Sequence, residues 1–258
     1  MPKQWVKFPH AAKSYALDAA ALKKQWARLH RGDCEPVPKG ADALDAWRLF
    51  HAGDFGGAVE KGLAAGGAAS NAAIKAQAIY ATYLEPSEKA KLALFEEAAG
   101  WAERRRAEAP KDANAHYLHA FAMGRYSQGI SVAKALTQGF GGRIKEALTT
   151  ALKLEPKHAE AHTAYGAYQA EVINKVGALV GGMTYGAKKD SAIEHYETAL
   201  KVHPDSAIAR IEYGNGLLLL FGKARLSDVE KLYAEAAQCK PADAMERLDV
   251  EHARSELE

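Results

Sequence analysis

The sequence predicts an all-α protein, built as a right-handed α–α superhelix of helix pairs with long insertions between paired helices. Three observations predict it: a phrase that recurs after four prolines, an apolar helical stripe ahead of three of these prolines, and an alanine-rich composition. The 258 residues are 48% hydrophobic and 26% charged, which suffices for one solenoid. We therefore expect residues 1–258 to form a single helical-repeat domain.

The recurring phrase starts at a proline each time, and we number its positions from that proline. The four prolines are Pro110, Pro156, Pro204 and Pro241, separated by 46, 48 and 37 residues. A proline suits the start of a helix because the first turn does not need its missing N–H. Gly166 and Gly214 share position +10. Glycine costs about 1 kcal/mol relative to alanine inside a helix, so these positions indicate a closely approaching neighbour helix.

An apolar stripe precedes each later proline. Ahead of Pro156 it consists of Ile144, Leu148, Ala151 and Leu152, and equivalent residues precede Pro204 and Pro241. The i, i+4, i+7, i+8 spacing places these residues on one face of an α-helix. Each unit is therefore predicted to be a helix, a connection and a second helix that ends at the next proline.

In chain order, the pattern predicts an N-terminal helix and connection over 1–40, with the helix itself at 11–31. Two degenerate helix pairs follow over 41–108, three clearer repeats over 109–240 and a C-terminal capping helix over 241–258. Within the degenerate pairs, Ser70 or Asn71 is expected to cap a helix that runs to Leu84. Glu251 occupies position +10 of the last phrase, so no further helix is expected to pack there.

The first two helices end alike. Trp, His, Gly and Asp recur with an offset of 21 residues in the segments 26–33 and 47–54. Gly32 and Gly53 suit the position just after a helix C-terminus, and Asp33 and Asp54 suit a turn or an N-cap. The sequence thus predicts capping chemistry for these motifs, in preference to catalysis.

The repeats resemble the tetratricopeptide repeat, whose period is about 34 residues. The Ala-Leu-x-x-x-Pro ending of that motif is present at Ala151 to Pro156 and again at Ala199 to Pro204. The chain departs from the motif where an early aromatic residue is replaced by His116, His162 and Arg210. Its units are also longer, because apolar, glycine-containing insertions separate the paired helices at 127–142 and 174–189.

These insertions make residues 110–240 similar to the regulator-of-microtubule-dynamics family and to tetratricopeptide-type lipoproteins associated with bacterial periplasmic transporters. The most similar segment comprises Thr184 and Tyr185, followed by residues 191–196. The resemblance implies a helical-repeat fold. It implies microtubule or organelle-membrane binding only through regions that this chain lacks, and the lipoproteins' lipidated cysteine is also absent.

Charge and apolar patterning exclude several classes of function. A net charge of +2 is not the basic balance of a nucleic-acid binder, so runs such as Arg104 to Arg106 are expected to form solvated faces. No apolar stretch approaches the ~20 residues of a transmembrane helix, and no signal peptide is recognisable. Cys34 and Cys239 form no CxxC and are expected to be free thiols. A cytoplasmic location is predicted.

The motif search predicts no enzyme, no metal and no cofactor. His158 and His162 stand at i, i+4, but a two-histidine set lacks the third ligand that zinc normally takes, and the same holds for His116 with His119. The glycine-rich segments 139–142 and 181–186 do not match GxxxxGK[ST].

The predicted binding surface is the inner face, which the first helix of each repeat should line. A protein or peptide partner is expected to contact aromatic, His, Arg and amide side chains there, because aromatic and Arg residues are the usual interface anchors. The candidate residues are His116, Tyr117, His162, Tyr168, Arg210, Asn215 and Tyr185. Two alternatives stay open: Tyr168 packs as core, or the insertions 127–142 and 174–189 roof a pocket for a small or extended apolar ligand.

Overall fold

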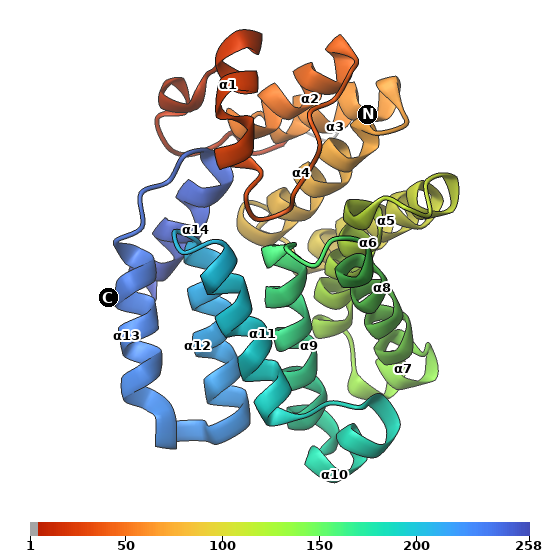
Figure 1. Cartoon of the computed structure of the whole chain (residues 1–258), viewed down its shortest axis with the longest axis vertical. Helices are drawn as coiled ribbons and strands as arrows, with labels where there is room; N and C mark the ends of the chain where they lie inside the picture. Colours follow the sequence, from red (N-terminus) through yellow and green to blue (C-terminus); the bar gives the residue numbers. More distant parts are fainter. Residues whose placement is uncertain (1–4) are drawn as a thin grey trace.

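The computed structural model describes residues 5–258, and every regular element in that range is helical. Helix α1 (Ala19–Leu29) precedes the repeats and α14 (Ala244–Ser255) follows them (Figure 1). The pairs between them are α2 (Ala41–His51) with α3 (Phe55–Ala65), α4 (Ala69–Tyr83) with α5 (Glu88–Glu108), α6 (Ala113–Gln128) with α8 (Phe140–Leu154), α9 (Ala159–Val176) with α11 (Lys189–Val202), and α12 (Ala207–Phe221) with α13 (Leu226–Ala237). The predicted α–α superhelix of helix pairs is therefore present.

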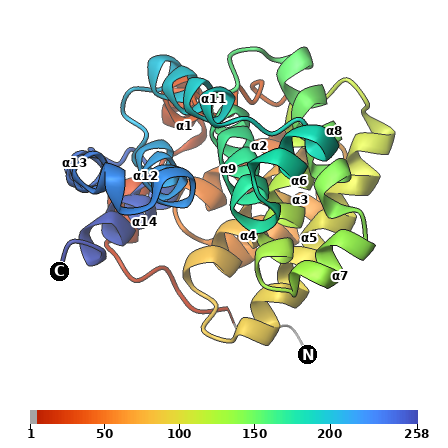
Figure 2. The ribbon, with the colours of Figure 1, turned by 90° about the horizontal axis from the view of Figure 1, so that it is seen from below.

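Both predicted insertions contain short helices. Helix α7 (Val132–Thr137) lies between α6 and α8, and α10 (Ala178–Val180) continues into a π-helical turn, η2 (Gly181–Tyr185), before α11. Helix α7 contacts α8, and η2 contacts α9 and also α8. Figure 2 shows both insertions on the side of the molecule that carries α8 and α9.

Position +2 of the phrase caps the first helix of each repeat. Its side chain accepts a hydrogen bond from a backbone N–H in the first turn, which satisfies a donor that has no partner within the helix. The capping residues are Asp112, His158, Ser206 and Asp243. The proline phrase is therefore a helix start signal, in which an Asp, His or Ser side chain serves as the N-cap.

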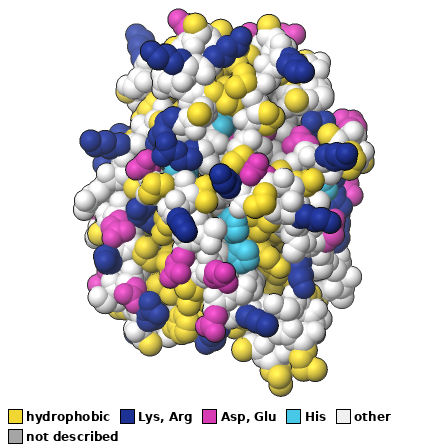
Figure 3. All heavy atoms as spheres, in the orientation of Figure 1, with side chains coloured by type: hydrophobic (Ala, Val, Ile, Leu, Met, Phe, Trp, Pro, Cys, Tyr) yellow, Lys and Arg dark blue, Asp and Glu magenta, His cyan; other side chains and the backbone are white. Residues whose placement is uncertain are grey.

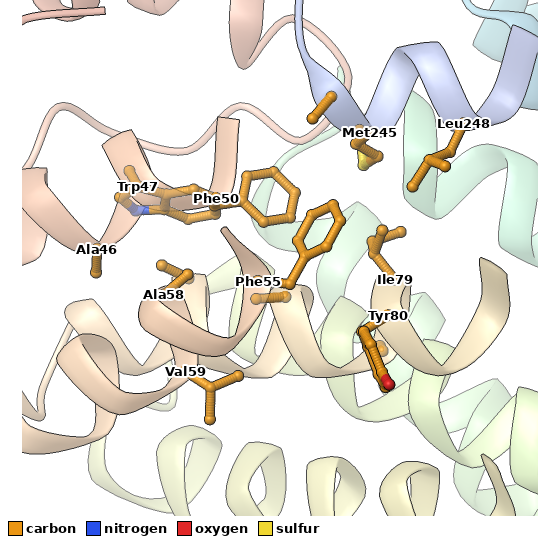
Figure 4. Packing of buried hydrophobic residues seen from close by; sticks show 14 of the residues in the cluster. Ala46, Trp47, Phe50, Phe55, Ala58, Val59, Ile79, Tyr80, Met245 and Leu248 are labelled. Atoms are coloured by element: carbon orange, nitrogen blue, oxygen red, sulfur yellow. The ribbon is translucent and has the colours of Figure 1, made fainter. Parts of the chain in front are cut away.

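The first helices form a closed inner ring. Each contacts the next in the order α2, α4, α6, α9, α12 and α14, and α14 returns to contact α2. At this closure Met245 and Leu248 of α14 join the same buried cluster as Phe50, Phe55 and Ile79 (Figure 4). The predicted capping helix is accordingly buried on one face, because the N-terminal helices lie against it. Glu251 remains on its partly exposed face.

Polar contacts reinforce the closure. The Arg28 guanidinium donates two hydrogen bonds to the Glu246 carboxylate, at 2.6 and 2.9 Å. His51 Nδ1 lies 2.7 Å from an Asp243 carboxylate oxygen, so the cap of α14 also binds α2. Since these partners come from opposite ends of the chain, they fix the ring that the repeats form.

The glycines at position +10 mark close helix contacts, as predicted. A Cβ on Gly166 would lie 2.9 Å from the Tyr196 ring and 3.0 Å from the Ala192 carbonyl oxygen. A Cβ on Gly214 would lie 3.1 Å from the Tyr233 ring. A tyrosine of the second helix therefore packs on the glycine of the first helix in both repeats.

Two predicted helix starts were wrong. The first helix does not begin at residue 11, because a 3₁₀ turn at Ala12–Tyr15 precedes the true N-cap, Asp18. Nor does Ser70 or Asn71 cap α4, which begins at Ala69. Asn71 is buried inside the helix, where its side chain donates to the carboxylates of Glu35 and Asp112.

The two His-x-Gly-Asp segments, residues 30–33 and 51–54, have different structural roles. Gly53 has a φ of 84° and Asp54 caps α3, as predicted. In the first motif the positive φ belongs to Cys34 (52°), so Gly32 is not the expected left-handed residue. Asp33 is a turn residue, as the sequence allowed, because it lies in the turn after α1 and its carboxylate accepts from the Glu35 N–H. The same carboxylate is buried and contacts His30 and Lys75, so it also joins a tertiary charge cluster.

Candidate functional site

A cleft opens inside the ring of first helices. Its walls come from α4, α6, α8 and α9, with contributions from α7, η2, α12 and α14. The cleft encloses ≈ 1370 Å³ of empty space, counted with its opening to solvent. Concave sites lined by several elements are the usual places for ligands and partner segments.

Most of the lining is apolar and comes partly from the two insertions. Val132 and Leu136 belong to α7, Tyr185 to η2, Phe140 to α8 and Val172 to α9. Phe121 and Tyr117 of α6 also line the cleft, with ring centroids 6.0 Å apart and nearly parallel planes. The insertions therefore form part of the cleft wall.

Apart from Asp249, the charged lining residues form ion pairs with one another. Lys75 Nζ lies 2.8 Å from Glu160 and 2.6 Å from Asp33. Arg125 lies 2.7 Å from Glu212. Burial alone would lower the pKa of Lys75, but the Asp33 and Glu160 carboxylates outweigh it and raise that pKa. The cleft thus contains charges without presenting a strong unpaired one.

Two polar groups have unusual environments. The Tyr83 hydroxyl donates to Asp249, and burial raises the pKa of that carboxyl to about 8. The Tyr168 hydroxyl is buried and has no hydrogen-bond partner among residues 5–258. An unsatisfied buried hydroxyl costs about 1–3 kcal/mol. Among the described residues that line the cleft, Tyr168 alone has a buried side-chain polar atom without a partner.

Of the residues predicted to bind a partner, three line the cleft: Tyr117, Tyr168 and Tyr185. Tyr117 and Tyr168 are buried, and Tyr185 is half-buried. Gly141 allows close approach of the Tyr185 ring, since a Cβ there would lie 2.7 Å from it. The structure therefore brings these three tyrosines together around one cavity.

The other four predicted residues lie outside the cleft. His116, His162 and Arg210 share position +6 and hydrogen bond to the carbonyl of their own repeat proline, at 3.0, 3.1 and 2.6 Å. Asn215 accepts a hydrogen bond from the Tyr233 hydroxyl at 2.7 Å. In the repeats that begin at Pro156, Pro204 and Pro241, positions +4 and +8 face the cleft, and position +6 is about 200° away around a helix. The +6 residues therefore do not line this cleft.

Sequence reasoning missed the lining residues at positions +4 and +8. In the last three repeats position +4 is Glu160, Ile208 or Met245, and position +8 is Ala164, Glu212 or Asp249. The first repeat differs, because α6 lines the cleft through Tyr117 and Phe121. The signal was available, because residues four apart share a helix face. The residues at these positions are a mixture of polar and apolar types. A search for aromatic and His side chains therefore does not find them.

The His158 and His162 side chains do not form a pair. His158 is fully buried, accepts from the Ala161 N–H and contacts the Asn114 amide, so both of its ring nitrogens are used. His162 Nδ1 lies 2.7 Å from His195 Nδ1 on α11. Across residues 5–258, no three His, Cys, Asp or Glu side chains are grouped so that they could hold a metal ion.

The leucine run at 217–220 is part of the packed helix α12. Leu217 and Leu220 are buried, whereas Leu218 is exposed. Among the described residues, no helix combines the length and the apolar character needed to cross a bilayer.

The fold is also found in known proteins. A thermophilic TPR protein from Thermus thermophilus has a solved structure that aligns with a TM-score of 0.58 at 17% identity, covering 83% of this chain and 97% of that chain. This likeness concerns the fold. No curated protein matches the sequence. The sequence model of regulator of microtubule dynamics protein 1-3 matches residues 71–213, more than half of the 258 residues. The chain belongs to the regulator of microtubule dynamics protein 1-3 family.

Proposed function

We propose that the protein is a non-enzymatic interaction module whose partner inserts apolar side chains of one segment into the central cleft. The observation that carries the proposal is the location of the cleft, on the inner ring of first helices. Helical-repeat folds offer this concave surface for binding. The fold supports this class of function, and the residues that line the cleft indicate which side chains of a partner would fit.

The lining supports an apolar anchor. Arg125 pairs with Glu212, and Lys75 is shared by the carboxylates of Glu160 and Asp33. A charged partner group would therefore lose its hydration without gaining a strong unpaired counter-charge. Aromatic or aliphatic side chains gain from burial against Phe121, Phe140 and Val172.

We further propose that Tyr117, Tyr168 and Tyr185 contact the partner. Of the three, Tyr168 should contribute most to partner binding, because its buried hydroxyl lacks a hydrogen-bond partner among the described residues. A backbone N–H or carbonyl of the partner segment would satisfy it. The proposed contacts do not include His116, His162, Arg210 or Asn215.

A second candidate is a carrier for a small or extended apolar ligand. The two insertions favour it, because Val132, Leu136 and Tyr185 partly cover the cleft. Native mass spectrometry of protein purified from its source distinguishes the two. A copurified small molecule supports the carrier, and a bare protein mass weakens it.

The test uses a variant that fills the cleft. Ala167 lines the cleft, and Ala167→Trp should block it without removing a hydrogen bond. His162→Ala/Arg210→Ala is the matched control, because both side chains lie outside the cleft. Wild type and both variants, each checked to be folded, are used to capture partners from native lysate with cross-linking.

A partner retained by wild type and control, lost with Ala167→Trp and cross-linked near α6 or α9 would support the module. Equal capture by all three proteins would contradict it. Loss of a copurified small molecule in Ala167→Trp, with no change in captured proteins, would favour the carrier.

We also propose a cytoplasmic location and no nucleic-acid partner. Cys34 and Cys239 are both free thiols, which suits a reducing compartment. The net charge of +2 is low for a protein that binds a polyanion.

A further inference from the structure

The insertion between α9 and α11 ends in an exposed apolar tip, which we define as residues 178–183. Leu179 is 76% exposed, Val180 50% and Met183 81%. In Figure 3 hydrophobic side chains project at the foot of the molecule, where Figure 1 places α10. Contiguous exposed apolar side chains of this kind mark interaction sites.

Two glycines flank the tip, which packs on α9 through its backbone. Gly177 and Gly186, which flank it, have φ values of 82° and 69°, a region that glycine enters without strain. Within the tip only Gly181 is buried, and it packs near Val172 and Ile173 of α9. The tip is therefore a convex, anchored projection with its large side chains facing outward.

Basic residues surround the tip. Lys175 precedes it and Lys188 follows it, whereas residues 172–189 contain no Asp or Glu and Asp190 comes directly after them. Lys189 does not contribute, because its Nζ donates to the Leu220 carbonyl of α12 at 2.7 Å. Lys145 of α8 is also close, because its Nζ lies 3.0 Å from the position of a Cβ on Gly186. Glu171 neutralises part of this charge through Lys175, at 3.2 Å. Lys188 remains exposed on the other side.

We propose that residues 178–183 insert into the surface of a bilayer that contains anionic lipid, with the neighbouring lysines at the headgroups. A few apolar side chains beside basic residues form a peripheral membrane anchor. The apolar side chains enter the boundary of the acyl chains, and the basic side chains bind lipid phosphates. A convex tip fits a deformable bilayer surface. The proposal is independent of what occupies the cleft.

Vesicle sedimentation tests the insertion. The full chain is mixed with phosphatidylcholine vesicles that contain about one third phosphatidylserine, an anionic surface of the kind that basic segments bind. The test variant is Leu179→Asp/Met183→Asp. The control is Leu218→Asp/Leu226→Asp, which changes two exposed leucines elsewhere by the same charge. We expect the tip variant to lose affinity by about tenfold or more and the control to bind like wild type.

A second pair of variants tests the basic surround. Lys175→Ala/Lys188→Ala should weaken binding and flatten its dependence on salt, because each lysine near the surface adds attraction that salt screens. Lys23→Ala/Lys24→Ala removes the same charge from the exposed face of α1 and should leave binding unchanged. Circular dichroism and thermal melting check that all variants are folded.

Three outcomes would overturn the proposal. The first is no sedimentation of wild type with anionic vesicles at low salt. The second is equal binding by wild type and the tip variant. The third is concentration-dependent self-association of wild type that the tip variant loses, without vesicle binding, which would assign the tip to a second copy of the chain.

Discussion

At position +6, histidine and arginine make the same hydrogen bond in different repeats. His116, His162 and Arg210 all bond the carbonyl of their own proline. A carbonyl only accepts, so each histidine carries its proton on Nε2 there. In neutral His162 this leaves Nδ1 as an acceptor, and His195 Nδ1–H must then donate across the 2.7 Å contact. Burial also lowers the pKa of His162, which favours the neutral ring.

A single methyl group tests the close approach at position +10. Gly166→Ala places a Cβ 2.9 Å from the fully buried Tyr196 ring and 3.0 Å from the Ala192 carbonyl oxygen, neither of which can readily move. We expect a loss of about 2 kcal/mol in the free energy of unfolding. Urea denaturation measures it.

Gly100→Ala is the matched control. Gly100 is inside α5 and a Cβ there meets nothing within 4 Å. The control should gain about 0.5–1 kcal/mol through helix propensity. If both variants lost or gained stability alike, the steric account of Gly166 would be wrong.

At the scale of elements, local signals located most helices. The proline, its +2 cap and the apolar stripe define α6, α8, α9 and α11, because these signals lie within the helix that they specify. The start of α4 and the buried contacts of Asp33 could not be predicted in this way. Asn71 and Asp33 are polar residues buried by partners far along the chain. Nothing in their local sequence distinguishes them from caps.

The connection between α1 and α2 is an element without regular structure that binds three helices. The Gly32 carbonyl accepts from the Glu160 N–H of α9, and the Asp33 carbonyl accepts from the Asn114 amide of α6. Lys75 of α4 lies between the carboxylates of Asp33 and Glu160. This lysine holds the connection to the inner ring.

Replacing Lys75 should lower the free energy of unfolding, because the buried carboxylates of Asp33 and Glu160 would lose their cation. We expect Lys75→Met to lose about 3–5 kcal/mol near neutral pH, since two buried negative charges lose their cation. The pKa of Asp33, which Lys75 and His30 hold below its ordinary value, should then rise above its unfolded value, and the pKa of Glu160, which burial already raises, should rise further. The folded variant would bind more protons than the unfolded chain, so its deficit should shrink as the pH falls from about 8 to about 5. Urea unfolding at several pH values measures this.

Lys91→Met is the control for Lys75→Met. Lys91 pairs with Glu88, whose side chain is 82% exposed, so its loss should change stability by no more than about 0.5 kcal/mol at any of these pH values. A deficit in Lys75→Met that grew on acidification would contradict the buried-carboxylate explanation.

At the scale of the whole molecule, the closed ring was beyond sequence reasoning. The pattern predicted the order of the helices and three of the tyrosines in the cleft. It did not predict that Met245 and Asp249 would complete the cleft, because contacts between the two ends of the chain leave no periodic signal. Repeat geometry sets such contacts, and small rotations between pairs accumulate over the solenoid.

The Arg28–Glu246 pair offers a direct test of the closure. Arg28→Glu should cost about 2–4 kcal/mol by placing two carboxylates together in a partly buried site. The double variant Arg28→Glu/Glu246→Arg should recover part of this. Recovery stays incomplete because Glu246 also accepts from the Ala242 N–H. Urea unfolding of the two single variants and the double variant gives the coupling energy.

Arg31→Glu is the control for this cycle, since Arg31 and Asp205 form an exposed pair at 3.4 Å. Its cost should stay below about 1 kcal/mol. A double variant no more stable than the sum of its single changes would show that the charge pair does not hold the ring together.

The closed ring also constrains how this chain can change in length. An open solenoid can gain or lose a repeat at little cost, because each unit contacts only its neighbours. Here an additional helix pair between α11 and α12 would carry α14 away from α2 and separate Arg28 from Glu246. Duplication of a repeat, the usual way in which such proteins diversify, would open the cleft. We therefore expect variation to accumulate in the insertions, where added residues leave the number of helix pairs unchanged.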